Sequence, residues 1–107
     1  MNTNTVIAMY RPKPGGEEGL RGLVATHHPR LVELGLATER PPVLLQAGDG
    51  TLLEIFDWVG PEALEIAHTH VEVQAMWTDF LEFCDYVSLG DLPEAGGPFP
   101  HFARLSS

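Results

Sequence analysis

The stretch VLLQAGDGTLLEIFDWVGPEALEIAH, residues 43–68, carries the signals that decide the fold. Two apolar runs, residues 43–47 and 51–58, flank a Gly-Asp-Gly turn, and this arrangement predicts a β-hairpin. Pro61 follows the second run, with an acidic residue directly behind it. Because proline is well tolerated at the first position of a helix, Pro61 predicts that the chain changes from strand to helix here.

The segment upstream of this hairpin predicts a strand and then a helix. Residues 5–11, TVIAMYR, are mainly β-branched, apolar or aromatic, which is typical of a strand. Apolar side chains then recur at three- and four-residue steps through residues 20–34, and this period predicts a helix that Gly35 ends. Pro29 lies inside it and removes one backbone hydrogen bond, so we expect the helix to bend or divide there.

The segment downstream predicts a divided helix, a strand and a tail. The helix that begins at Pro61 is expected in two parts, residues 63–68 and 73–84. Residues 85–89 predict a fourth strand. Residues 90–107 contain three prolines and two adjacent glycines, and they predict a tail that wraps a surface.

The order of these elements predicts the fold class. The segments that begin at Thr5 and Thr51 resemble each other, since each is a strand followed by a Gly/Pro turn and an acidic helix start. Two such units with returning strands give β-α-β-β-α-β, and right-handed crossovers place the first and third strands at the centre. We therefore expect a ferredoxin-like α+β fold, with an antiparallel four-stranded sheet and both helices on one face. The bare face predicts a homodimer.

Composition restricts the class of protein. A chain of 107 residues suits one domain over residues 1–107, with a core at about 5–89. The 44% hydrophobic content is that of a globular protein, and no apolar run approaches the roughly 20 residues of a membrane helix. A net charge of −9 disfavours nucleic acid and anionic membranes as partners.

The single cysteine and the first residues bear on the compartment. Cys84 has no second cysteine for a disulfide or a CxxC metal site, and we interpret it as a small core residue. The opening residues, MNTNTV, lack the pattern of a secretory signal. We therefore expect a cytoplasmic protein.

The segment EIFDWVGPEALEIAHTHVEVQAMW, residues 54–77, resembles the strand-to-helix signature of antibiotic biosynthesis monooxygenase-like proteins. Trp58 ends the strand, a Gly-Pro-Glu turn opens the helix, and Ala63 and His68 follow. The resemblance implies a dimeric α+β barrel, and it implies His68 as a functional residue. Members of this superfamily include cofactor-free oxygenases of polyketide quinols, haem-degrading enzymes and small isomerases. The first strand here lacks the asparagine of the haem-degrading branch.

Glu54 is the acid that lies in the otherwise apolar interior of the strand at residues 51–58, whereas Asp57 lies near the strand end. Alternation places Glu54 on the same sheet face as Phe56 and Trp58, and the neighbouring first strand adds Tyr10 to that face. A buried carboxylate is costly unless it has a partner. One interpretation is a general base that removes a proton from an aromatic hydroxyl group. The other is a structural pair, for example with an Arg or His across the dimer.

The histidines are further candidates for a functional role. His68 lies where the second helix breaks, and it is either a proton shuttle or a cap for a free backbone group. His27 and His28 precede Pro29, which frees the Ala25 carbonyl for a histidine or a water. The histidine spacing does not support a metal site, so no metal or cofactor is predicted. The predicted substrate-pocket residues are Tyr10, His28, Phe56, Trp58 and Trp77, and the predicted catalytic residues are Glu54 and His68.

Two functions follow from these residues. The first is a cofactor-independent monooxygenase or isomerase that acts on a small aromatic or quinol-like molecule in an apolar pocket. The alternative is a non-catalytic dimer that binds a small molecule or has a structural role, with Glu54 and the histidines simply paired.

Overall fold

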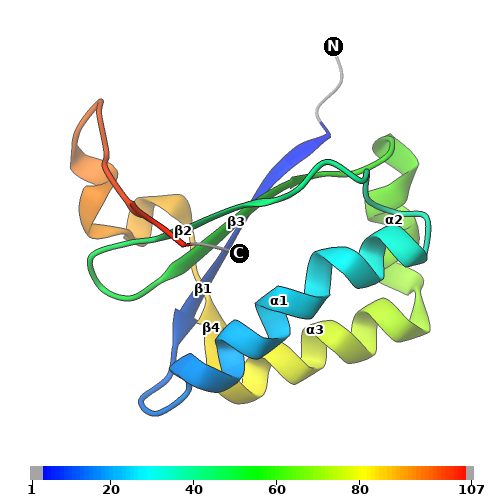
Figure 1. Cartoon of the computed structure of the whole chain (residues 1–107), viewed down its shortest axis with the longest axis horizontal. Coiled ribbons are helices and arrows are strands. Elements are labelled where there is room, and N and C mark those ends of the chain that lie inside the picture. Colours follow the sequence, from blue (N-terminus) through cyan, green and yellow to red (C-terminus); the bar gives the residue numbers. More distant parts are fainter. Residues whose placement is uncertain (1–3, 106–107) are drawn as a thin grey trace.

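The computed structural model describes residues 4–105, which form an α+β fold with three α-helices and one antiparallel sheet (Figure 1). The elements in chain order are β1 (Thr5–Pro12), α1 (Glu17–Glu33), β2 (Val43–Gln46), β3 (Leu52–Asp57), α2 (Pro61–Thr69), α3 (Val71–Phe83), β4 (Cys84–Tyr86) and β5 (Ala103–Arg104). Two short 3-10 turns, Leu89–Asp91 and Pro93–Gly96, lie between β4 and β5.

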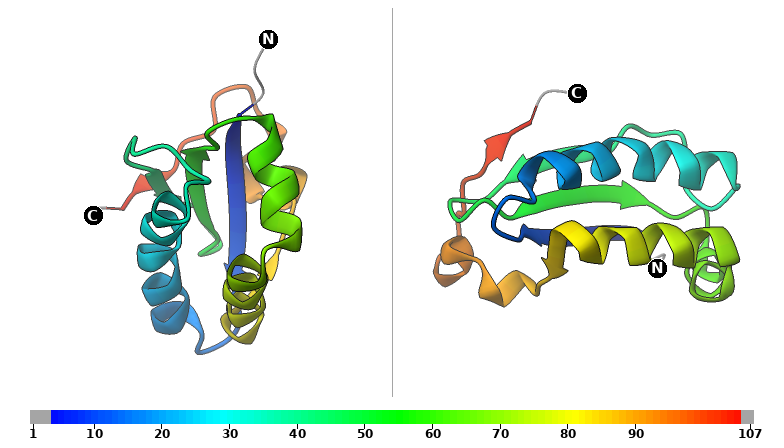
Figure 2. Two further views of the ribbon diagram at one scale, coloured as in Figure 1. Left: turned by 90° about the vertical axis from the view of Figure 1, so that its right-hand side faces the viewer. Right: turned by 90° about the horizontal axis from the view of Figure 1, so that it is seen from below.

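The sheet has the order β4-β1-β3-β2-β5. The predicted side-by-side placement of the first and third strands is present, since Tyr10 faces Leu52 and Ala8 faces Glu54 across the central pair. All three helices lie on one side of the sheet (Figure 2), and α1 and α3 contact each other.

The predicted count of four strands is too low, because residues 4–105 form five. Ala103 pairs with Gln46, so β5 extends the sheet beyond β2. A two-residue strand has no detectable period, which is why the sequence pattern did not reveal it. The predicted fourth strand at residues 85–89 is also misplaced: β4 starts at Cys84 and ends at Tyr86, and Ser88 instead caps the first 3-10 turn.

The helices follow the sequence closely, with one exception. The second helical region is divided as predicted, because His70 has an extended backbone between α2 and α3. Helix α1, by contrast, runs without interruption from Glu17 to Glu33, so the expected division at Pro29 does not occur. Buried His28 and Leu31 on either side of Pro29 hold the turn against the sheet, and Gly35, with φ of +77°, follows its end.

The first turn of α1 approaches the end of α3 very closely. A Cβ atom on Gly16 would overlap the backbone oxygen of Phe83, and a Cβ on Gly19 would overlap the Phe83 ring. The same oxygen accepts a hydrogen bond from the Lys13 backbone N–H at 2.8 Å. Glycine at these two positions therefore permits the contact between α1 and the α3–β4 junction.

The tail covers part of the sheet face that the helices leave open. Leu92 and Phe102 pack there against Leu53 and Met9, in a cluster separate from the core beneath the helices. The tail was predicted to wrap a surface. The surface that it wraps is the sheet of its own chain.

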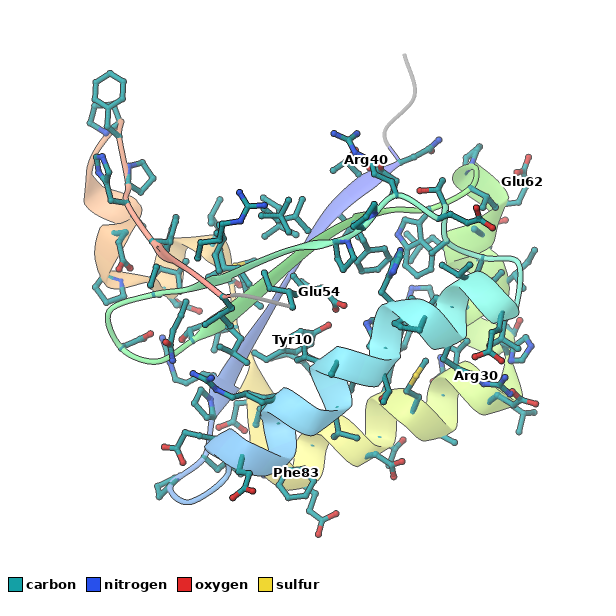
Figure 3. All side chains as sticks on the ribbon, viewed as in Figure 1. Tyr10, Arg30, Arg40, Glu54, Glu62 and Phe83 are labelled. Atoms are coloured by element: carbon teal, nitrogen blue, oxygen red, sulfur yellow. The ribbon has the colours of Figure 1, made fainter. Side chains whose placement is uncertain are left out.

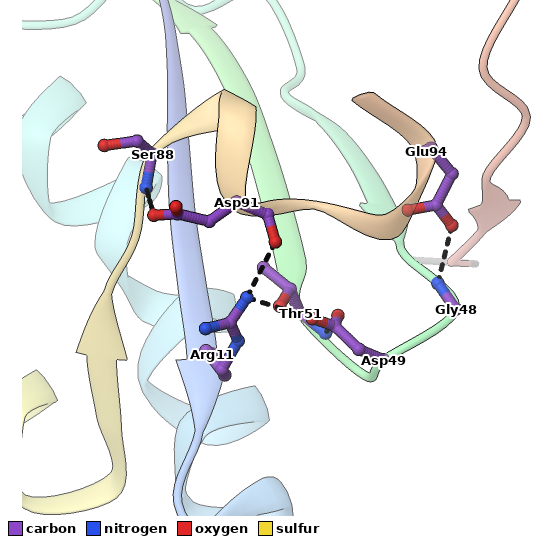
Figure 4. A network of polar contacts seen from close by, with 7 residues as sticks. All are labelled: Arg11, Gly48, Asp49, Thr51, Ser88, Asp91 and Glu94. Atoms are coloured by element: carbon purple, nitrogen blue, oxygen red, sulfur yellow. Dashed lines mark hydrogen bonds and ion pairs between the residues drawn. The ribbon is translucent and has the colours of Figure 1, made fainter. Parts of the chain in front are cut away.

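Polar contacts join the tail to the β2–β3 turn (Figure 4). Arg11 donates to the Asp49 carboxylate and to the Asp91 carbonyl, both at 3.1 Å, and the Gly48 N–H donates to Glu94 at 2.7 Å. Burial acts to raise the pKa of Asp49, but hydrogen bonds from Thr51 and the charge of Arg11 outweigh it, so this pKa lies below its ordinary value. The turn and the tail are thus held by ionic as well as apolar contacts.

Candidate functional site

A buried chain of hydrogen bonds lies between the sheet and the helices. Glu54, on β3, is fully buried, and its Oε1 accepts a hydrogen bond from the Tyr10 hydroxyl at 2.8 Å. The same oxygen lies 2.7 Å from Nδ1 of His27, on α1. Trp77, on α3, donates from Nε1 to His27 Nε2 at 3.0 Å. Figure 3 shows Glu54 and Tyr10 in the space between the sheet and α1.

These partners fix the tautomer of His27. The indole N–H of Trp77 can only donate, so Nε2 of His27 must be the acceptor and carries no proton. Nδ1 therefore holds the ring proton and donates it to Glu54. Nδ1 of His27 and the Tyr10 hydroxyl thus both donate to one oxygen of the Glu54 carboxyl group. Its other oxygen, Oε2, is buried and has no partner among residues 4–105.

Strand alternation and register bring these groups together. Tyr10 and Glu54 both point to the helix side of the sheet, and Ala8, which lies opposite Glu54, is small. His27 falls on the buried face of α1 with Val24 and Leu31. The helix therefore directs an imidazole at Glu54, the acid in the interior of β3.

A mostly apolar cavity of about 350 Å³ adjoins this chain of hydrogen bonds. We call it the β1 cavity, because it follows β1 beyond the point where β4 stops pairing with it. Tyr10, His27, Trp77 and Tyr86 bring polar groups to its wall. The remaining lining residues are Val6, Ile7, Ala8, Met9, Phe56, Trp58, Leu64 and Val87.

Four of the five predicted pocket residues line the β1 cavity: Tyr10, Phe56, Trp58 and Trp77. The fifth, His28, does not; it lines a separate cavity beside α1 and donates from Nε2 to the Thr38 carbonyl at 2.9 Å. This hydrogen bond holds the His28 ring outside the β1 cavity, so His28 is not part of the pocket that the other four residues line.

The two predicted catalytic residues are placed differently. Glu54 is not among the lining residues of the β1 cavity, but Tyr10 and His27, which it holds, are. His68 is exposed on α2, where its ring meets the edge of Trp77 at 5.7 Å between centroids. It is not among the lining residues either.

Sequence reasoning missed the role of His27. It identified a carboxylate that needs a partner, and it suggested an Arg or His from another subunit. The partner is a histidine of the same chain, 27 residues away. The sequence did contain a signal for this pair. His27 lies on the apolar face of the predicted helix, and the predicted fold packs that face against the sheet face that carries Glu54.

Burial sets the protonation of the two tyrosines at this site. Burial, followed by the charge of Glu54 and the hydrogen bond to it, raises the pKa of Tyr10 far above its ordinary value. Burial also raises the pKa of Tyr86, to about 12, with a smaller contribution from Cys84. Tyr10 is therefore a stable hydrogen-bond donor at neutral pH, which leaves His27 as the cavity's basic group.

Neither a metal cluster nor a membrane helix is found in residues 4–105. No three His, Cys, Asp or Glu side chains gather there in a way that would hold a metal ion. No helix in the same range is both long and apolar enough to cross a membrane. Cys84 is buried with its thiol directed to the Phe80 carbonyl, and burial raises its pKa to about 11.

The arrangement is suited to proton transfer. A carboxylate that accepts from Nδ1 orients the imidazole and stabilises the imidazolium that forms when Nε2 takes a proton. Comparisons of the chain with protein-family models, with curated proteins and with solved structures find no match. The geometry of the His27–Glu54 pair and its cavity is therefore the basis for assigning a function.

Proposed function

We propose that the chain binds a small aromatic, quinol-like molecule in the β1 cavity and removes the proton of its hydroxyl group with His27. The observation that carries this proposal is that His27 lines the cavity while Glu54 holds its Nδ1 proton. Phe56, Trp58 and Trp77 supply flat apolar walls, which suit an aromatic ring.

The proton moves from the hydroxyl oxygen of the ligand to Nε2 of His27, which leaves an electron-rich anion in an apolar cavity. Reprotonation of that anion on carbon, by the same His27, is an isomerisation. Reaction with dioxygen instead is an oxygenation: a ring C–H carbon and the ionised C–O⁻ carbon both become carbonyls, one oxygen atom of O₂ is inserted, and the other leaves as water with the C–H hydrogen and the proton held by His27. Both reactions need the same base, and the chain's own groups supply it without a cofactor.

Trp77 must give way for this step. Its indole N–H occupies Nε2 of His27, so the hydroxyl of the ligand has to replace it. Trp77 is half-buried and lines the same cavity, so its ring has room to move without crossing the core.

The alternative proposal is binding without chemistry. It is favoured by the fact that Tyr10, Glu54, His27 and Trp77 already form hydrogen bonds with one another. In that case the β1 cavity holds an aromatic ligand, and these four hydrogen-bonded residues only support the cavity wall.

His27→Gln separates these proposals. With naphthalene-1,4-diol as the probe, binding is followed by quenching of tryptophan fluorescence, and turnover is followed by oxygen uptake above the rate in buffer. We expect the variant to bind within about threefold of the unaltered chain. Its turnover should fall by about 10²- to 10⁴-fold, the usual contribution of a general base.

His101→Gln is the matched control, because it makes the same chemical change at an exposed histidine of the tail that does not line the cavity. It should leave both binding and turnover unchanged. Turnover that survives in His27→Gln would contradict the role of the base. Binding by the unaltered chain without oxygen uptake or isomerised product would favour the alternative, and no quenching at all would exclude the cavity as the aromatic site.

We also propose that the fold is of the ferredoxin-like type and that two copies form a dimeric α+β barrel, as in the antibiotic biosynthesis monooxygenase-like proteins that residues 54–77 resemble. The order β4-β1-β3-β2 within the sheet supports this assignment. So does an apolar row that crosses three strands on the face opposite the helices, where Val43 pairs with Ile55 and Ile55 pairs with Ile7.

Ile7→Glu tests the dimer. Ile7 is 41% exposed at the end of this row, in a stretch of β1 without a charged residue from Thr5 to Met9. We expect light scattering at micromolar concentration to give a dimer for the unaltered chain and a monomer for Ile7→Glu. Val71→Glu, at an 82% exposed position on α3, should remain a dimer. A monomeric unaltered chain would contradict the proposal.

A further inference from the structure

A second and larger cavity lies on the same helix-covered face of the sheet as the β1 cavity, but toward the β2 edge of the sheet. It measures about 460 Å³ and runs between α1, β2 and the end of the tail; we call it the α1–β2 groove. Its lining residues are Arg21, Val24, Ala25, His28, Pro29, Pro42, Leu44, Leu52 and Leu105.

The walls of this groove are aliphatic. Val24, Leu44, Leu52 and Leu105 form its sides, and no Phe, Tyr or Trp is among its lining residues. Leu105 is held over the groove because its backbone N–H donates to the Leu44 carbonyl at 2.9 Å. The groove therefore suits a flexible hydrocarbon chain, in contrast to the aromatic walls of the β1 cavity.

One cation stands on the wall of the groove. Arg21 makes no ion pair within residues 4–105, although Glu17 and Glu18 lie one turn earlier on α1. Arg11 and Arg40, by contrast, each pair with an aspartate. In a chain with a net charge of −9, a guanidinium that has no ion pair among the described residues and lies beside an apolar groove is available to an anionic ligand.

We infer that the α1–β2 groove is a binding site for an aliphatic carboxylate, with the carboxylate at Arg21 and the hydrocarbon chain between Val24 and the leucines. A guanidinium binds a carboxylate through two parallel N–H donors, which orients the head of the ligand. The apolar walls supply the remaining affinity by removing the chain from water. This site does not depend on His27 or on the proposed chemistry.

Three probes of equal chain length test the inference on the full chain: octanoate, octan-1-ol and octylammonium, each titrated by calorimetry. We expect octanoate to bind about three- to tenfold more tightly than octan-1-ol, since a partly exposed ion pair gives a modest gain. Octylammonium should bind more weakly than both. Equal affinities for the three probes would overturn the inference.

Arg21→Gln should reduce octanoate binding to the level of octan-1-ol and leave octan-1-ol unchanged. Arg104→Gln is the matched control, because Arg104 is the partner of Leu45 in β2 and stands on the sheet face opposite the helices. It removes the same charge and should leave the preference for octanoate intact. A preference that survives Arg21→Gln would overturn the role of the arginine.

The position of the ligand is tested by filling the groove. Ala25 is exposed on α1 and lines the groove, so Ala25→Phe should weaken octanoate and octan-1-ol alike. Thr26→Phe, at the next exposed position, does not face the groove and should change neither. In NMR spectra, octanoate should shift the methyl signals of Leu44 and Leu105. Shifts confined to the Trp77 indole would instead place it in the β1 cavity and overturn the inference.

Discussion

Glu54→Leu should lower the free energy of unfolding by about 2–4 kcal/mol. The substitution removes the acceptor shared by the Tyr10 hydroxyl and His27 Nδ1. Each buried donor left without a partner costs about 1–3 kcal/mol. The loss of a buried charge and the gain of an apolar side chain offset part of that cost.

Glu54→Gln should cost less, about 1–2 kcal/mol, because the amide oxygen still accepts from Tyr10 and His27, although the charge is lost and an NH₂ group takes the place of the buried Oε2. Urea unfolding curves measure both changes. Glu65→Leu is the control, since it makes the same substitution at an exposed position of α2 and should stay within about 0.5 kcal/mol of the unaltered chain. If Glu54→Leu were as stable as the unaltered chain, Glu54 would have no part in holding Tyr10 and His27.

Gly16→Ala should destabilise the fold by about 1–3 kcal/mol, the usual cost of forcing an added methyl into a packed site. The new Cβ would overlap the Phe83 carbonyl oxygen, and backbone that already accepts from Lys13 cannot move aside freely. The φ of Gly16, −94°, suits alanine, so the expected loss comes from the close contact and not from backbone strain.

Gly22→Ala provides the contrast on the same helix. A Cβ on Gly22 meets no atom within 4 Å, and alanine is favoured over glycine inside a helix. This variant should therefore gain about 0.5–1 kcal/mol. Thermal unfolding should lower the midpoint of Gly16→Ala and raise that of Gly22→Ala, and a rise for both variants would show that α1 does not approach Phe83 this closely.

The fold could be predicted wherever a residue pattern repeats over a full element. The alternation of residues 51–58 and the period of residues 20–34 were sufficient to locate β3 and α1. The pairing of Ala103 with Gln46 was not predictable, because two residues have no period. The continuity of α1 through Pro29 depends on burial by distant residues, which local propensity does not describe.

The residues that the sheet contributes to the candidate site could be predicted from the sequence. Their partners on the helices could not. Period-two alternation placed Glu54, Tyr10 and Phe56 on one face, and the structure has them there. The partner His27 depends on how α1 is rotated against the sheet, and a helical period gives the buried face without saying which strand residue it meets. His68 points to solvent for the same reason, because α2 buries Ala63 and Ala67 instead.

The central strand pair also has a kinetic consequence. Tyr10 and Glu54, which meet at the middle of the sheet, are 44 residues apart, and all of α1 and β2 lie between them. Closing so long a loop lowers the conformational entropy of the chain before the stabilising contacts of the sheet have formed. Helix α1 and the β2–β3 hairpin can form from local contacts alone. The hydrogen bond from Tyr10 to Glu54 can then form only as β1 docks, so the docking of β1 completes both the centre of the sheet and the candidate site.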